Sequence, residues 1–268
     1  MPNYIENVYK QYGDGMGEDS RATRSRSQSL EFHYTKQALD EYINNNTRVL
    51  EVGCATGYYA FNFADKCREY VGVDLFPPHI ELFKQKIAGS GFSNISCFVG
   101  NAKNLDVVES DSFDVVCCLG PMYHLPPVER ELVFAECSRV CKPGGVIAFA
   151  YINKIGVYVG ACVHDEYRSV YPNRKTNDFL LRQGTDDEKP GTFYFTMPEE
   201  IEAAAAKHGL VKLRNMGTDS FITMSIVDKM DDETFEIYME LADEMVKHES
   251  CTGMSNHALL ICRKPETR

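Results

Sequence analysis

Short apolar runs alternate with amphipathic stretches along the middle of this 268-residue chain. Five of the runs are rich in β-branched and aromatic residues, which favours strands: RVLEVG, YVGVDL, ISCFVG, FDVVCCL and VIAFAYI. Between the runs, apolar residues recur every three to four positions, which predicts helices over residues 58–66, 78–89 and 127–140. Strands that alternate with helices in this way are typical of a parallel sheet covered by helices.

The same pattern predicts elements on both sides of this alternation. Residues 28–43 have the apolar spacing of a helix. Residues 153–195 have a weak pattern and several turn signals, so we expect an insertion there. The alternation resumes with TMPEEIEAAAAKHG, in which Thr196 and Glu199 have the spacing of a capping box. A strand near LVKLRNMG, an acidic helix and a last strand, HALLICR, complete the chain.

The charge is unevenly distributed along the chain. The 28 Lys and Arg residues against 39 Asp and Glu residues give a formal charge of −11, and nine acidic and two basic residues lie between positions 228 and 250. In this stretch Met230, Ile237, Leu241 and Met245 recur at helical spacing, which predicts an amphipathic helix with an acidic face in solvent. The acidic balance argues against a nucleic-acid partner, because phosphate backbones select concentrated basic surfaces.

Composition narrows the class of protein further. The chain is 44% hydrophobic and 25% charged, which matches soluble globular proteins. No apolar run approaches the roughly 18 residues of a membrane helix, and the first residues carry no signal-peptide pattern, so we expect a cytoplasmic protein without membrane contact. The ten cysteines form no CxxC pair and lie mostly in apolar runs. We expect buried free thiols and no metal site.

The most informative segment is VLEVGCATGYYAF, at residues 49–61. A strand that runs into Gly53 and Gly57 predicts a tight turn, where backbone amides approach a ligand at a helix N-terminus. This turn fits either a dinucleotide fingerprint or the turn of a nucleoside-binding methyltransferase. The third glycine of a dinucleotide fingerprint falls at Tyr58, a large residue, which weakens that interpretation. Asp74 ends the next strand, where a carboxylate can accept hydrogen bonds from ribose or merely cap the strand at the surface.

The sequence resembles the class I S-adenosylmethionine-dependent methyltransferases, and in particular bacterial enzymes of the small-molecule type. The resemblance rests on a series of segments between residues 48 and 151: VLEVGCATG, VGVDL, FVGNA, DSFDVVCCLGPMYHL and RVCKPGGVIAF. It implies a Rossmann-like α/β fold, a three-layer sandwich around a mostly parallel seven-stranded sheet with an antiparallel last strand.

The resemblance also implies one methyltransferase domain over residues 1–268. Its parts are an N-terminal lid and first helix at 1–45, a cofactor-binding core at 46–152, a cap insertion at 153–195, and a segment at 196–268 that completes the sheet.

The resemblance implies a binding site for S-adenosylmethionine, with S-adenosylhomocysteine as product. The residues that match the family's cofactor contacts are Glu51 near the methionine ammonium, Gly53, Ala55 and Gly57 under the methionine, Asp74 on the ribose, Leu75 on the adenine, Asn101 and Ala102 near the adenine amine, and Leu119 and Gly120 near the sulfonium. Ala55 replaces the family's middle glycine and Asn101 a frequent aspartate. We expect these changes to lower cofactor affinity without excluding binding.

Candidate residues for chemistry and acceptor binding follow from the same comparison. His124 in GPMYHL is our candidate base and Tyr123 a candidate wall of the acceptor site, although the first equally suits a loop contact and the second core packing. Pro121 matches the acceptor side of strand four. The N-terminal segment offers Tyr9 and Tyr12 as aromatic faces of a lid.

Two further groups of residues are candidates for the acceptor site. Arg24, with Arg21 and Arg26, can contact a carboxylate or lie on the surface. Tyr158 is a candidate from the cap, as are His164, Tyr167, Tyr171 and Arg174.

We therefore expect an S-adenosylmethionine-dependent methyltransferase that transfers a methyl group to an O, N, C or S nucleophile of a small molecule by in-line displacement. Much of the rate of such a reaction comes from alignment, so a base is optional. The alternatives are methylation of RNA or protein, or non-catalytic binding of the cofactor. The sequence leaves open whether the protein is a monomer or a homodimer.

Overall fold

The computed structural model describes residues 4–13, 16–163, 174, 178, 192–219 and 224–266. One seven-stranded sheet has the order β3-β2-β1-β4-β5-β7-β6. Its strands are β1 (Arg48–Val52), β2 (Glu69–Asp74), β3 (Ile95–Val99), β4 (Phe113–Cys118), β5 (Cys141–Ile152), β6 (Val211–Gly217) and β7 (His257–Arg263). Strand β7 runs antiparallel to both of its neighbours, and the pairs among β1 to β5 are parallel. The expected fold class is confirmed.

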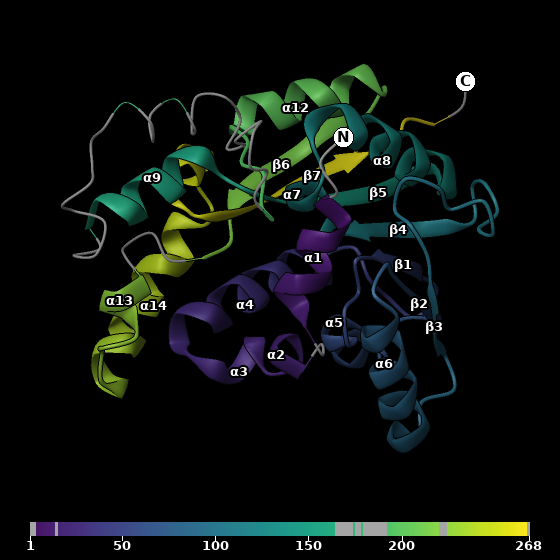
Figure 1. Cartoon of the computed structure of the whole chain (residues 1–268), viewed down its shortest axis with the longest axis horizontal. Coiled ribbons are helices and arrows are strands. Elements are labelled where there is room, and N and C mark those ends of the chain that lie inside the picture. Colours follow the sequence, from purple (N-terminus) through teal and green to yellow (C-terminus); the bar gives the residue numbers. More distant parts are fainter. Residues whose placement is uncertain are drawn as a thin grey trace.

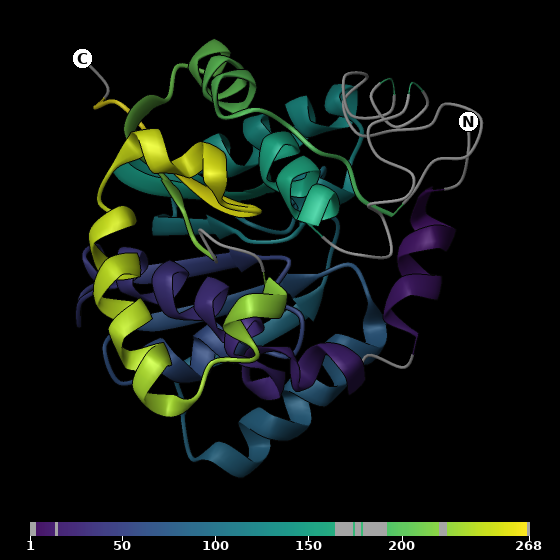
Figure 2. The same cartoon turned by 90° about the vertical axis from the view of Figure 1, so that its left-hand side faces the viewer.

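Helices lie on both faces of this sheet (Figures 1 and 2). Their bounds are α1 (Tyr4–Tyr12), α2 (Met16–Asp19), α3 (Arg21–Arg24), α4 (Arg26–Asp40), α5 (Tyr58–Phe63), α6 (Pro77–Ser90), α7 (Pro121–His124), α8 (Pro127–Val140), α9 (Lys154–Val163), α12 (Pro198–Lys207), α13 (Met224–Val227), α14 (Asp232–Met245) and the 3-10 helix η1 (Glu249–Met254). None of the described helices is both long and apolar enough to cross a membrane.

Alternate strand residues feed two separate cores, because successive side chains of a strand point to opposite faces. Val49 of β1 packs with residues of α4, α5, α6 and α14, and Leu50 with residues of α8 and α12. Helices therefore cover the central strands β1 and β4 on both faces, as the near-continuous apolar sequences of these strands predict. Among the described residues nine cysteines are free, and seven of these are buried in the cores.

Some expected helix ends agree with the structure and others do not. The helix expected at residues 127–140 is α8, whereas the helix expected at residues 28–43 is α4, Arg26–Asp40. The first long helix begins at Arg26, because the Ser25 side chain accepts a hydrogen bond from Gln28 N. The expected capping box of Thr196 and Glu199 is wrong by one residue. Met197 is the N-cap, and Glu200 Oε2 accepts hydrogen bonds from Met197 N at 2.9 Å and Thr196 Oγ1 at 3.1 Å.

The acidic helix α14 also differs from the expectation in its buried face. Ile237 and Leu241 are more than half exposed, whereas Tyr238 and Ala242 are buried against the core that includes α4. Tyr34 Oη of α4 donates a hydrogen bond to Asp243 Oδ1 at 3.0 Å. Part of the acidic stretch therefore holds the N-terminal helix to the C-terminal part of the chain, in addition to facing solvent.

Candidate functional site

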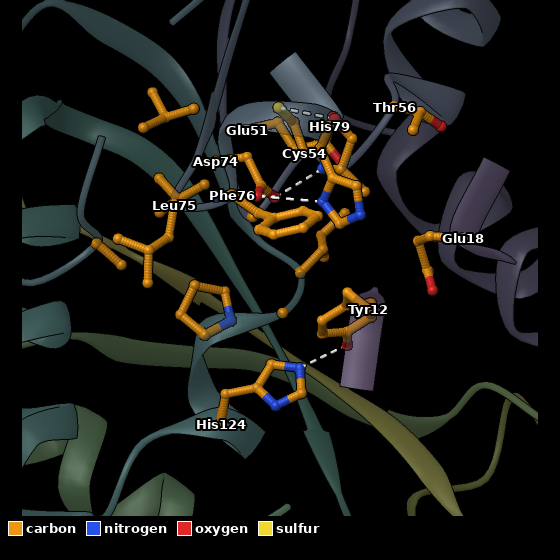
Figure 3. Close-up of a pocket in the computed structure, with 18 of the residues that line it drawn as sticks. Tyr12, Glu18, Glu51, Cys54, Thr56, Asp74, Leu75, Phe76, His79 and His124 are labelled. Carbon is orange, nitrogen blue, oxygen red and sulfur yellow. Dashed lines mark hydrogen bonds and ion pairs between the residues drawn. The ribbon is translucent and has the colours of Figure 1, made fainter. Parts of the chain in front are cut away.

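A cavity of about 1190 Å³, its open mouth included, lies at the carboxyl ends of β1, β2 and β4. Its floor comes from the glycine turn after β1, the turn after β2, residues 100–102, residues 119–121 and residues 123–125. The segments α1 to α4 supply the facing wall, with Tyr9 and Tyr12 among its residues. Figure 3 shows Tyr12 and Glu18 of this wall. This is the edge at which open parallel sheets bind ligands.

The structure brings nearly all of the expected cofactor residues together in this cavity. Those that line it are Glu51, Gly53, Ala55, Asp74, Leu75, Asn101, Ala102, Leu119 and Gly120. Gly57 is not among the described lining residues. It has φ +86 at the start of α5, and a Cβ there would lie 2.2 Å from the ring of Phe83. Its position favours close packing of helix α5 against α6.

The glycine turn approaches its neighbours as closely as its sequence suggests. Gly53 has φ +84, and a Cβ on it would lie 2.7 Å from Pro121 Cδ. Ala55 has φ +44, a left-handed conformation that costs an alanine roughly 1–2 kcal/mol. Ala55 N donates a hydrogen bond to Asp74 Oδ2 at 2.9 Å, which helps to hold this conformation.

Asp74 connects the two turns that form the floor. Its Oδ1 accepts a hydrogen bond from Phe76 N at 2.8 Å and lies 3.2 Å from His79 Nδ1, while Oδ2 accepts from Ala55 N. Sequence reasoning did not identify His79, because a single histidine in an amphipathic helix carries no distinguishing local signal. The carboxylate that resembles the family's ribose contact therefore also organises the pocket.

Glu51 is a buried carboxyl group at the end of β1. It is 2% exposed, and Tyr70 Oη donates a hydrogen bond to its Oε2 at 2.8 Å. Burial, reinforced by the nearby negative charge of Asp74, raises the pKa of Glu51 to about 8, against the opposing effect of the Tyr70 hydrogen bond. A cation bound beside this group would favour its ionised form.

His124 and Tyr12 meet on the opposite side of the cavity. Tyr12 Oη lies 2.7 Å from His124 Nε2, and His124 Nδ1 lies 2.9 Å from the Thr192 carbonyl oxygen (Figure 3). Since a carbonyl oxygen only accepts, Nδ1 carries the proton and Nε2 accepts from the tyrosine. Burial lowers the pKa of His124 to about 4, so this ring is uncharged at neutral pH.

The remaining candidates are distributed as follows. Tyr9 lies on the cavity wall against Phe76, and Pro121 lines the floor. Tyr123 is buried, lines the cavity, and its Oη donates to the Leu119 carbonyl oxygen at 3.3 Å. Arg24 and Tyr158 are not among the described lining residues, and Arg24 is exposed.

The other candidates from the cap are Arg174, His164, Tyr167 and Tyr171. Arg174 is exposed, while His164, Tyr167 and Tyr171 lie outside the described residues. The roles of all these residues stay predictions.

The arginine that reaches the cavity is Arg21. Its Nη1 donates to Glu31 Oε2 at 2.9 Å, its Nε donates to Glu18 Oε1 at 2.7 Å, and its guanidinium lies over the ring of Phe32. With Asp19, Glu51 and Asp74, five carboxyl groups line the cavity against this one arginine among the described residues. The acidic character of the chain therefore extends to the pocket, which suits a ligand that carries positive charge.

The family model and the curated relatives that match this chain are methyltransferases. Residues 49–145 match the family described as "Methyltransferase domain". The chain is 31% identical over 174 residues to the ubiquinone biosynthesis O-methyltransferase of Pseudomonas fluorescens strain Pf0-1. The matched segment covers 64% of this chain and 68% of that protein. It is 30% identical over 134 residues to the protein of the same name from Neisseria meningitidis serogroup A, covering 49% of this chain and 56% of that one. The match thus spans about half the length of the second relative.

Solved structures share the fold at low sequence identity. The N-methyltransferase NodS from Bradyrhizobium japonicum WM9, in complex with S-adenosylhomocysteine, superposes with a TM-score of 0.60 at 14% identity, over 97% of this chain and 100% of that one. The [4+2]-cyclase SpnF superposes with a TM-score of 0.62 at 15% identity, over 98% and 94%. Because proteins named for different reactions share this architecture, the fold alone does not settle the reaction.

Proposed function

Because this chain belongs to the S-adenosylmethionine-dependent methyltransferases, we propose that it transfers a methyl group to a hydroxyl of a small organic molecule. When bound, the cofactor supplies a methyl group that is already activated by its sulfonium. The described residues fit this ligand. Glu51 offers a buried carboxyl for the ammonium, Asp74 an acceptor for the ribose, and Gly53 a position in the cavity lining that carries no side chain.

The protein's own contribution to the reaction is orientation, exclusion of water and removal of one proton. Tyr12 on α1 contacts His124 after β4 directly on one side of the cavity, so α1 brings an aromatic wall to the acceptor side. Such enclosure aligns the acceptor for in-line attack and strengthens its polar contacts. His124 Nε2 is the group that we assign to receive the acceptor's proton.

The single observation that carries the hydroxyl assignment is the partly buried imidazole of His124, whose Nδ1 faces the Thr192 carbonyl oxygen and whose Nε2 is therefore an acceptor. A hydroxyl oxygen that attacks a methyl group becomes a strongly acidic oxonium, so even a base whose pKa is about 4 accepts its proton. A methylated amine stays a weakly acidic ammonium, which such a base cannot deprotonate effectively. The names of the relatives, which are O-methyltransferases, support the same choice.

For His124 to act, the Tyr12 hydroxyl must give up its place on Nε2 to the acceptor hydroxyl or relay the proton between them. Both groups stay uncharged near neutral pH, because burial lowers the pKa of His124 and raises the pKa of Tyr12. We therefore expect a rate that is independent of His124 titration across the neutral range, with an acid limb near pH 4 instead of 6.5.

The proposal is tested by incubating the protein with methyl-labelled cofactor and a metabolite extract and identifying the labelled product. We expect an O-methylated small molecule. With that acceptor, His124→Ala should lower kcat by about 10²-fold or more while S-adenosylhomocysteine affinity stays within about twofold. His248→Ala, at a side chain 59% exposed on the surface, is the matched control. Labelled RNA, labelled protein or no labelled product would reject the proposal.

A further inference from the structure

His79 is a buried polar side chain in the cavity that lacks a full set of partners. It is 3% exposed and lines the cavity from the first turn of α6. Its Nδ1 faces Asp74, but its Nε2 has no hydrogen-bond partner among the described residues. A buried nitrogen left in this state costs about 1–3 kcal/mol, so the position calls for a ligand atom.

The contacts of Nδ1 determine what Nε2 can bind. Both oxygens of Asp74 already accept hydrogen bonds from backbone N–H groups, so the carboxylate acts as an acceptor and Nδ1 as the donor. In the neutral ring Nε2 then carries a lone pair. The partner of His79 is therefore a group that donates a hydrogen bond, such as a hydroxyl.

Counting lone pairs on Asp74 shows why a second acceptor is needed beside it. A carboxylate has about four acceptor positions, two on each oxygen. Phe76 N and His79 Nδ1 use both positions of Oδ1, and Ala55 N uses one position of Oδ2. One position remains, whereas a ribose presents two neighbouring hydroxyls that each donate a hydrogen bond.

We propose that His79 Nε2 accepts a hydrogen bond from one ribose hydroxyl of the bound nucleoside, while Asp74 Oδ2 accepts one from the other. The assignment rests on the proposed function, since it concerns the cofactor of the same site. It makes His79 a cofactor-specificity residue, and its position in the first turn of α6, beside Asp74, links ribose recognition to the geometry of that carboxylate.

Two aromatic side chains of the cavity wall hold the ring of His79 in place. Phe76 and Tyr12 pack edge to face against it, with centroid distances of 4.9 and 5.5 Å. The ring points its second nitrogen away from Asp74, on the side of the cavity where Tyr12, Glu18 and Thr56 lie (Figure 3). Tyr12 thus contacts His79 and also bonds His124, so the lid touches both the cofactor side and the acceptor side.

The test measures binding of S-adenosylhomocysteine and of its 2′-deoxy and 3′-deoxy analogues by calorimetry. The proteins are the wild type, His79→Met, His79→Gln and the control His248→Ala. Methionine fills a similar volume without a nitrogen, so it removes the hydrogen bond and keeps the packing. Glutamine offers both a donor toward Asp74 and an acceptor toward the cavity. Thermal unfolding of each variant checks that it folds.

We expect both analogues to bind the wild type at least about tenfold more weakly than S-adenosylhomocysteine. In His79→Met, one analogue should bind as well as the parent ligand, because the hydroxyl that it lacks has no partner left. His79→Gln should regain part of the discrimination, and His248→Ala should match the wild type.

Equal losses for both analogues in the wild type and in each His79 variant would overturn the assignment and leave Nε2 to a contact other than ribose. Binding of the parent ligand by the wild type tests the proposed function separately. A wild type that binds S-adenosylhomocysteine while His79 shows no coupling to either hydroxyl rejects only the inference about His79.

Discussion

Glu51→Gln should stabilise the unliganded protein at neutral pH while it weakens cofactor binding. Burial raises the pKa of Glu51 from an ordinary value of 4.5 to about 8. Folding therefore favours the protonated carboxyl, and the unfolded chain favours the ionised one. The resulting stabilisation is fully present below pH 4.5 and is lost as the pH rises to 8. Glutamine, which is neutral at every pH, keeps an acceptor oxygen for Tyr70 and escapes this loss.

The magnitude follows from about 1.4 kcal/mol for each pH unit between the two pKa values. The wild type should lose about 3 kcal/mol relative to the variant between pH 4.5 and 7, and about 4 kcal/mol by pH 8. Any fixed cost of burying the glutamine amide shifts the comparison equally at every pH.

The assay is urea unfolding of both proteins at pH 5, 7 and 8.5, with the difference in unfolding free energy as the readout. The difference should move by about 3 kcal/mol in favour of the variant between pH 5 and 7 and level off above 8. A difference that does not change with pH would refute the assignment of a raised pKa to Glu51. Calorimetry should show weaker S-adenosylhomocysteine binding by the variant, because its ammonium loses the charged partner.

Two further predictions concern the floor of the cavity. Asp74→Ala should weaken S-adenosylhomocysteine binding more than tenfold and lower the unfolding free energy by about 1–3 kcal/mol, because three donors lose their acceptor. Calorimetry measures the affinity and urea unfolding the stability, with Asp65→Ala at an exposed position as the control. Unchanged affinity would contradict the ribose role of Asp74. Gly57→Ala should lower the unfolding free energy, measured in urea, by about 2–5 kcal/mol, since its Cβ would lie 2.2 Å from the Phe83 ring. Gly91 also has a positive φ, +78, but no atom lies within 4 Å of a Cβ placed there. Gly91→Ala should therefore lose only about 1–2 kcal/mol, from the strained backbone conformation. Equal losses in the two glycine variants would show that the aromatic contact is unimportant.

The order of elements was predictable because it depends on local patterns. Alternating apolar runs place β1 to β5, and the antiparallel β7 follows from the resemblance of the last strand. Gly53 and Asp74 were also predictable, since a tight turn and a strand end are encoded in a few neighbouring residues. Helix α14 shows the limit of this reasoning. Its sequence supports more than one apolar face, and packing against the core that includes α4 buries Tyr238 and leaves Ile237 exposed.

The contacts that would perform chemistry come from residues far apart in the chain. Tyr12 and His124 are separated by 112 positions, and their hydrogen bond depends on how α1 lies across the carboxyl edge of the sheet. The lowered pKa of His124 and the raised pKa of Glu51 arise from burial, which is a property of the whole packed structure.

The sequence by itself thus determined the architecture and the cofactor turn, because backbone conformation and side-chain periodicity are local properties. Only the tertiary structure decided that Arg21 reaches the cavity while Arg24 stays exposed, and that His79 lines the cavity with an Nε2 that has no hydrogen-bond partner among the described residues. Such outcomes depend on how the N-terminal helices, the strand ends and the helices that cover the sheet are placed relative to one another. That placement results from the many apolar contacts that close the two cores, and no single segment encodes it.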